Sequence, residues 1–97
     1  MQNGFAHDIP AEAFNQAIAY IIPEPAAPLG YKLEVTDAIF DKIPKYYIEC
    51  SDDRAIPISV QHSMYLGNVK KVFTLNSSHT PNFSQPDKLA AILLEVI

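Results

Sequence analysis

The chain has 97 residues, a length that suits one small domain with a modest core, because short chains bury a smaller share of their surface. Its formal net charge is −4 and its lysines and arginines are scattered, which argues against nucleic-acid partners and anionic membrane surfaces. The single cysteine, Cys50, excludes an internal disulfide, and no apolar run approaches the ~20 residues of a membrane-spanning helix.

The N-terminal segment MQNGFAHDIPAEAF has neither the basic nor the apolar stretch of a signal peptide, so we expect a cytoplasmic location. Asp8 can cap a helix that has Pro10 in its first turn, and apolar residues recur at helical spacing from Phe14 to Ile21. The proline-rich stretch PEPAAPLG, residues 23–30, cannot continue a helix and predicts an extended connector. We therefore divide the chain into residues 1–30 and residues 31–97.

The second part predicts two strands that alternate with helices. After a short turn of helix capped by Thr36, residues 46–50 (YYIEC) have the aromatic and β-branched content of a buried strand. Residues 56–67 predict a helix that ends at Gly67, and the next strand covers residues 72–75 (VFTL). The chain closes with a helix whose cap candidate is Ser84 and whose apolar residues share one face: Leu89, Ile92, Leu93 and Val96.

This order of strand, helix, strand and helix predicts an α/β fold with two parallel strands, because a parallel neighbour is reached through a crossover, which is right-handed. Asp53 follows the first strand and His79 follows the second, 26 positions later. Since parallel strands end at the same edge of a sheet, we expect these two residues to lie in adjacent loops.

A carboxylate beside an imidazole can hold the ring in one tautomer and stabilise the imidazolium that forms during proton transfer. Asp53 and His79 therefore predict an acid and base pair. The pattern alone also allows a structural interpretation, in which the aspartate caps the following helix and the histidine is only solvated.

Three stretches of the chain resemble the C-terminal part of α/β-hydrolase-fold esterases, in the branch of plant methyl-ester esterases, hydroxynitrile lyases and bacterial esterases. They are PEPAAPL, IPKYYIECSDDRAIP and SSHTPNFSQPDKLAAILLEV. The resemblance implies that Asp53 is the triad acid, that His79 is the triad base and that no cofactor is needed. It also implies that residues 1–30 are a remnant of the cap region and that residues 31–97 are the C-terminal α/β-hydrolase portion.

The chain departs from the family because it contains no G-x-S-x-G nucleophile motif and no oxyanion-hole loop. We therefore expect a fragment or truncated homologue of a serine ester hydrolase that is inactive alone and acts on a small ester only when the missing part completes it. The alternative is a non-catalytic oligomerising α/β module derived from a hydrolase.

Other chemistries are less well supported by the sequence. A thiolate at Cys50 could replace the serine, and Ser51, Ser77 and Ser78 neighbour the pair, but no strained nucleophile turn is indicated and we expect these serines to form loop hydrogen bonds. A metal site would recruit His62, His79, Asp52 and Asp53, which lack the close spacing of metal ligands. We expect His7 and His62 to be surface residues.

The predicted strand Tyr46–Cys50 also bears on assembly. In the family's sheet this strand has a neighbour on both sides, and only one of them is in this chain. An unpaired strand edge invites another chain, so we expect a homo-oligomer, most simply a two-fold dimer joined through Tyr46 to Cys50.

Overall fold

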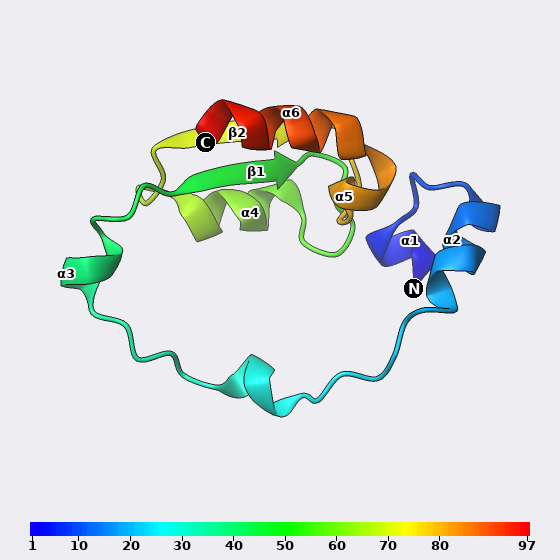
Figure 1. The fold of residues 1–97 in the computed structure, drawn as a ribbon, viewed down its shortest axis with the longest axis horizontal. Coiled ribbons are helices and arrows are strands. Elements are labelled where there is room, and N and C mark those ends of the chain that lie inside the picture. Colours follow the sequence, from blue (N-terminus) through cyan, green and yellow to red (C-terminus); the bar gives the residue numbers. More distant parts are fainter.

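The computed structural model describes residues 1–97 and contains a small α/β unit joined to an N-terminal helical segment by a long connector (Figure 1). Strands β1 (Tyr46–Cys50) and β2 (Lys71–Leu75) form a two-stranded parallel sheet in which Tyr46 pairs with Lys71 and Cys50 with Leu75. The α/β class and the parallel pairing expected from the sequence are confirmed.

Helices cover both faces of this sheet. The crossover helix α4 (Ile58–Tyr65) packs on β1, and the C-terminal helix α6 (Pro86–Val96) packs on β2 from the other face (Figure 1). Helix α4 is followed by Gly67 with φ +75°, a left-handed conformation that costs glycine little and that ends the helix where the sequence predicted. Ser84 is not the cap of α6, because it ends the short helix α5 (Pro81–Ser84), and Gln85 precedes α6.

The N-terminal segment contains two helices, α1 (Gln2–Phe5) and α2 (Ala11–Ile18), instead of one helix that begins at Asp8. Pro10 occupies the cap position of α2, and its ring restricts the backbone before the helix. Asp8 is thereby free for another partner, described below.

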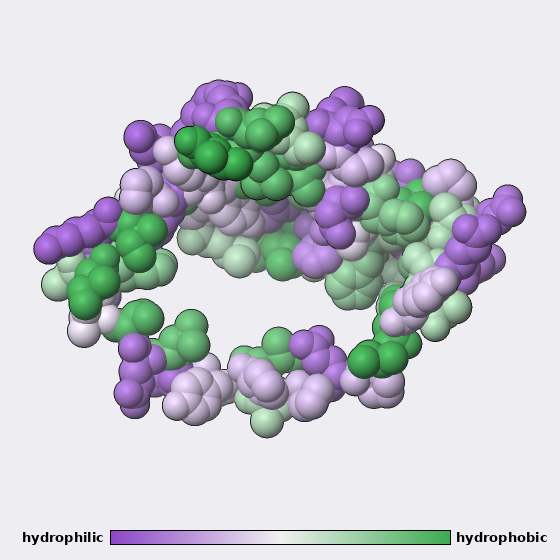
Figure 2. All heavy atoms as spheres, viewed as in Figure 1, coloured by the Kyte–Doolittle hydropathy of each residue, from purple (hydrophilic) through white to green (hydrophobic).

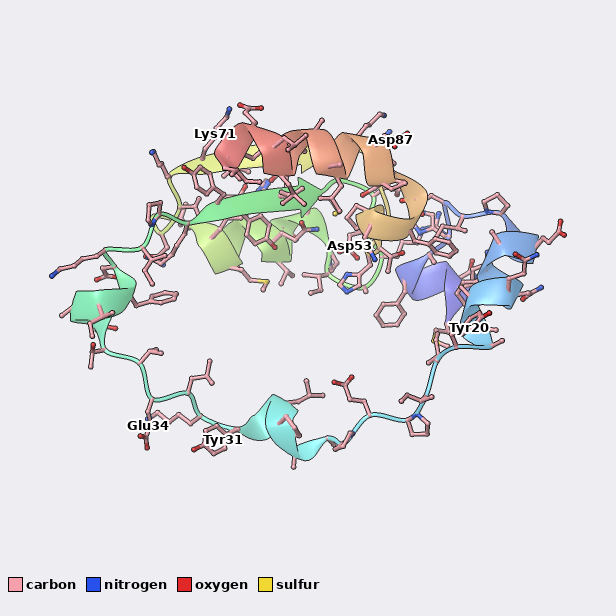
Figure 3. The ribbon with its side chains drawn as sticks, in the orientation of Figure 1. Tyr20, Tyr31, Glu34, Asp53, Lys71 and Asp87 are labelled. Atoms are coloured by element: carbon pink, nitrogen blue, oxygen red, sulfur yellow. The ribbon has the colours of Figure 1, made fainter.

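Residues 19–45 run as an extended arc that contains only the short 3₁₀ helix η1 (Ala27–Gly30) and the short helix α3 (Asp37–Phe40). Large apolar side chains along the arc are exposed, with Leu29 at 84% and Tyr31 at 71%. Figure 2 shows apolar surface along this arc as well as on α6, and Figure 3 shows Tyr31 and Glu34 projecting from it. The arc therefore contributes almost nothing to a core within this chain.

The buried residues gather at the carboxyl ends of the two strands and in the segment that reaches them from the N-terminus. Only seven residues are buried: Ala6, Ile9, Cys50, Gln61, Leu75, Ser77 and Ser78. Three of the seven are polar, so hydrogen bonds hold this region together as much as apolar packing does. No helix in the structure has both the length and the apolar character needed to cross a membrane.

Candidate functional site

Asp53 and His79 meet at the carboxyl edge of the sheet, as their positions after β1 and β2 predict. His79 Nδ1 lies 2.8 Å from Asp53 Oδ2. Because the carboxylate can only accept, Nδ1 carries the proton and donates it, which leaves Nε2 without a hydrogen bond inside the chain. The His79 side chain is 32% exposed and that of Asp53 is 5% exposed, so the pair presents an imidazole nitrogen to solvent above a buried acid.

The other oxygen of Asp53 holds its own loop. Oδ1 accepts hydrogen bonds from the backbone N–H groups of Ala55, at 2.8 Å, and Ile56, at 2.9 Å. Asp53 does not cap α4, whose cap residue is Pro57, but it holds the loop before that helix while its other oxygen contacts His79. Burial raises the pKa of Asp53, but the N–H of Ile56, the ring of His79 and the N–H of Ala55 outweigh burial, and the net pKa lies below the ordinary value.

Gln61 of α4 is a buried residue of this region that the sequence pattern did not single out. Its Oε1 accepts from the N–H of Cys50 and its Nε2 donates to the C=O of the same residue, each at 2.9 Å. A third bond, from Nε2 to the C=O of Ile56 at 2.8 Å, ties α4 to the Asp53 loop. A glutamine on a short helix gives no sequence signal for such contacts, since most glutamines are exposed.

His7 and Asp8 of the N-terminal segment also reach this region, which the sequence pattern did not predict. The His7 side chain is only 8% exposed and its Nε2 lies 2.7 Å from Asp52 Oδ2, so the prediction of a surface position for His7 is wrong. Asp8 Oδ2 accepts from the N–H of Ser78 at 2.9 Å. These contacts join residues 45 and 70 positions apart, a separation at which local sequence patterns carry no information.

The alternative nucleophiles are engaged elsewhere. Ser77 donates to the C=O of Ser78, and Ser78 donates to the C=O of Phe5. The hydroxyl of Ser51 lies within hydrogen-bond distance of the C=O of Leu75, at the end of β2, and of Asn76 Oδ1 in the loop that follows, so all three serines form hydrogen bonds in the loop region, as expected. Cys50 is buried, and desolvation raises the pKa of its thiol, which disfavours the thiolate that nucleophilic attack requires. None of these side chains bonds to His79.

The residues proposed for a metal site divide into separate pairs. His62, 55% exposed as predicted for a surface residue, lies 3.1 Å from Glu49, whereas Asp52 pairs with His7 and Asp53 with His79. No three histidine, cysteine or acidic side chains converge as metal ligands would. The structure thus favours two aspartate and histidine pairs side by side over one cluster.

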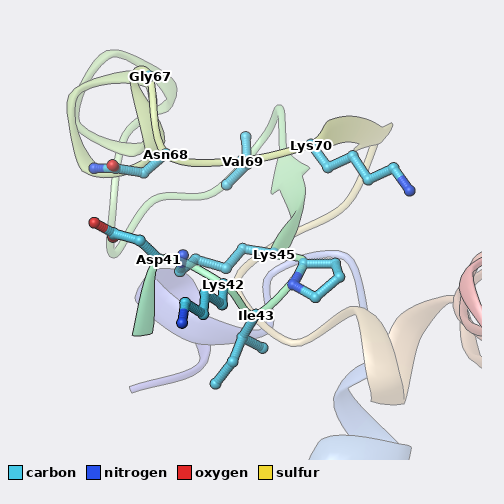
Figure 4. A pocket seen from close by; sticks show the side chains of 9 residues that line it. Asp41, Lys42, Ile43, Lys45, Gly67, Asn68, Val69 and Lys70 are labelled. Atoms are coloured by element: carbon cyan, nitrogen blue, oxygen red, sulfur yellow. The ribbon is translucent and has the colours of Figure 1, made fainter. Parts of the chain in front are cut away.

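Two hollows differ in their relation to the Asp53 and His79 pair. An apolar groove of about 380 Å³ is formed by α1, α2 and the segment after His79, and it is lined by Met1, Phe5, Ala6, Phe14, Ala17, Ile18, Ile21, Thr80, Asn82 and Phe83. Phe5 also contacts the His79 ring, with 5.2 Å between ring centroids, so the groove adjoins the pair. A polar hollow of about 500 Å³, which includes Lys45 and Lys70, lies before the strands begin (Figure 4), at the end opposite the pair.

Comparison with known proteins finds similar proteins, although no protein-family model matches the chain. The chain is 39% identical over 74 residues to an Arabidopsis thaliana protein named as methylesterase 11, covering 74% of this chain and 19% of that protein. It is 34% identical over 94 residues to a pyrethroid hydrolase from Sphingobium wenxiniae, covering 94% of this chain and 33% of that enzyme. The chain thus spans about a fifth to a third of these relatives.

The relatives also bear on location. Three of the Arabidopsis thaliana relatives, methylesterases 11, 13 and 15, are named as chloroplastic, which contradicts the cytoplasmic location expected from the sequence. That expectation was drawn from the first residues of the chain. In a chain that spans about a fifth of these relatives, those residues carry no information on a targeting segment.

Solved structures match the fold over nearly the whole chain. The structure of polyneuridine aldehyde esterase superposes with a TM-score of 0.86 at 19% identity, covering 99% of this chain and 39% of that one. A pyrethroid hydrolase from Sphingobium faniae superposes with a TM-score of 0.70 at 30% identity, covering 97% of this chain and 38% of that one. In sequence and in fold, the chain therefore corresponds to the C-terminal portion of an α/β-hydrolase-fold esterase.

Proposed function

We propose that this chain supplies the acid and the general base of a serine ester hydrolase and that it does not hydrolyse esters alone. The observation that carries the proposal is the 2.8 Å contact between Asp53 Oδ2 and His79 Nδ1, which leaves Nε2 free and partly exposed. In this role Nε2 accepts the proton of the attacking serine and returns it to the leaving alcohol. Asp53 stays ionised and orients the ring.

The nucleophile has to come from outside these 97 residues, since the chain has no G-x-S-x-G motif and its serines near the pair are hydrogen-bonded elsewhere. The names of the relatives point to methyl esters and pyrethroid esters as substrates. The apolar groove beside His79 suits the apolar part of such an ester.

A chimera tests the proposal directly. The part of the Sphingobium wenxiniae pyrethroid hydrolase that aligns with this chain over 94 residues is replaced by this chain, and kcat/KM is measured on a nitrophenyl ester. We expect an active chimera that loses about 10⁴-fold or more with His79→Ala, because triad members act as a unit. His62→Ala, which removes an exposed histidine that pairs with Glu49 and not with Asp53, is the matched control. A folded chimera that keeps its rate after His79→Ala contradicts the proposal.

We also propose a second, non-catalytic function as an oligomerising module, which one observation favours. The outer edge of β1 has no strand partner, because β1 pairs only with β2. Many large apolar side chains, among them Tyr20, Leu29 and Leu94, are exposed. Such surface is typical of protein interfaces.

A further inference from the structure

The segment Phe5–Asp8 touches both loops that carry the acid and the base. On one side, His7 Nε2 donates to Asp52 Oδ2, directly beside Asp53 in the chain. On the other side, Asp8 Oδ2 accepts from the N–H of Ser78, directly before His79. One short segment, about 70 positions away from His79 in the sequence, therefore bridges the two halves of the pair.

Further bonds tighten the contact with the His79 loop. The C=O of Phe5 accepts from the hydroxyl of Ser78 at 3.1 Å and from that of Thr80 at 2.9 Å. The rings of Phe5 and His79 lie at 73° in an edge arrangement, with 5.2 Å between their centroids. The residues on both sides of His79, and its ring, are thus restrained by the same segment.

The hydrogen bonds made by the segment Phe5–Asp8 restrain loop residues that the pairing of β1 with β2 does not hold. β1 ends at Cys50 and β2 at Leu75, so Asp53 and His79 lie three and four residues beyond the last ladder pair. A loop of that length leaves the imidazole several orientations unless other groups hold it. The sheet therefore brings the two loops to one edge, and the distance between the side chains depends on contacts made by the loops themselves.

Asp8 is the member of the segment best suited to hold the His79 loop. Burial raises the pKa of Asp8, but the polar groups of Ser78 and Ser84, among them the N–H of Ser78 that donates to the carboxylate, outweigh burial, so the net pKa is below the ordinary value. The carboxylate is therefore ionised at neutral pH, and a charged acceptor makes a stronger hydrogen bond than a neutral one. Its donor Ser78 is fully buried, where a lost partner is costly.

We infer that the segment Phe5–Asp8 is a positioning clamp in which Asp8 fixes the His79 loop and His7 fixes the Asp53 loop, so that the imidazole keeps its proton on Nδ1 and presents Nε2. This inference rests on the proposed function, because positioning matters only if His79 transfers protons. Asp8 and His7 are positioning residues, since neither touches the reacting nitrogen.

The test is the tautomer of His79 in the complete 97-residue chain, measured by long-range ¹H–¹⁵N NMR at about pH 9, above the ordinary histidine range. In the wild-type chain we expect the Nδ1–H tautomer. Asp8→Ala should lose that signature and show a mixture of tautomers, whereas Asp8→Asn, which keeps an acceptor for Ser78, should restore most of it. Ser63→Ala, which removes an exposed hydroxyl bond within α4, is the matched control and should change nothing.

Thr80→Ala provides a second variant that removes only an exposed hydroxyl from the clamp, so it tests the inference even if Asp8→Ala unfolds. Thr80→Ala should shift the tautomer population of His79 in the same direction as Asp8→Ala, by a smaller amount. A wild-type chain without the Nδ1–H signature contradicts the pair, and with it both the proposed function and the clamp. If the Nδ1–H signature survives in a folded Asp8→Ala chain, the clamp alone is contradicted. If the Asp8→Ala chain does not fold, a signature that is unchanged in Thr80→Ala contradicts the clamp alone.

Discussion

The side chain of Gln61 satisfies both backbone groups of Cys50 on the side of β1 that faces away from β2. Backbone groups of successive strand residues alternate in direction, and the N–H of Ser51 bonds Leu75 on the inner side. The groups of Tyr46, Ile48 and Cys50 therefore face outward, and only those of Cys50 are bonded by Gln61. The outer edge of β1 is thus closed at its carboxyl end, next to Asp53, and open at its amino end.

Gln61→Leu should lower the free energy of unfolding by about 1–3 kcal/mol, the usual cost of leaving a buried polar group without a partner. The apolar replacement is of similar size, so the loss reports on the bonds to Cys50 and Ile56 more than on packing. Urea unfolding followed by circular dichroism measures it. Ser63→Ala on the exposed side of the same helix should leave the free energy almost unchanged, and equal stability for both variants would contradict the role assigned to Gln61.

The isolated chain should show no turnover of nitrophenyl acetate above background, because the nucleophile and the oxyanion hole, which carry most of the rate, are not among its residues. His79→Ala should leave the background rate unchanged. His62→Ala controls for non-specific attack by an exposed imidazole. Turnover that disappears with His79→Ala but persists with His62→Ala would show that the chain is active by itself.

The chain should lose stability in acid because Asp8, Glu49 and Asp53 all have a pKa below the ordinary value in the folded state. A carboxyl whose folded pKa is depressed stabilises the fold fully above its unfolded value, about 4, and loses that contribution as the pH falls through the folded pKa. The free energy of unfolding should therefore fall below about pH 4.

Asp53→Asn should make this acid dependence shallower, because one of the three carboxyls no longer titrates. The measurement is urea unfolding between about pH 2 and pH 7, compared for the two chains. Asp37→Asn, which changes an acidic residue in the short exposed helix α3, is a suitable control. Parallel pH profiles for the wild type and Asp53→Asn would contradict the lowered pKa of Asp53.

The sequence predicted the parts of this fold that follow from local patterns. Strand β1 has the predicted bounds, β2 begins one residue earlier than predicted, and the rule for parallel crossovers was enough to bring Asp53 and His79 to one edge. The pair could be found because strand order alone places the two loops that carry it at one edge of the sheet. Whether its residues are catalytic stays a prediction.

Contacts between distant segments could not be predicted. Asp8 has the features of a helix cap, and only the tertiary structure shows that it accepts from Ser78 instead, since that bond depends on how the N-terminal segment returns to the sheet. His7 looks like an exposed residue for the same reason. The predicted boundary between residues 1–30 and 31–97 stays a prediction, and the contacts of Phe5–Asp8 cross it.

The open part of the β1 edge leads to the last prediction, that the chain forms a two-fold dimer. The outward groups of Tyr46 and Ile48 have no strand partner, and a two-stranded sheet is marginally stable by itself. Antiparallel pairing of two β1 strands about a two-fold axis near Tyr47 would place Tyr46 of one copy opposite Ile48 of the other, satisfy these groups in both copies and give a four-stranded sheet. Because Gln61 already bonds Cys50, the pairing should be centred on Tyr46 to Ile48 and not extend to Cys50.

Sedimentation at micromolar concentration should therefore detect a dimer. Ile48→Pro should dissociate or unfold it, because proline removes an outward N–H that the pairing uses, whereas Ile48→Val keeps that N–H and should keep the dimer. Hydrogen exchange adds a site-specific measurement, since the amide of Ile48 should be protected in the dimer and exchange rapidly if the edge is open. A compact wild-type monomer in which the Ile48 amide exchanges rapidly would contradict the prediction, because an open edge and a small core would then suffice for this chain in isolation.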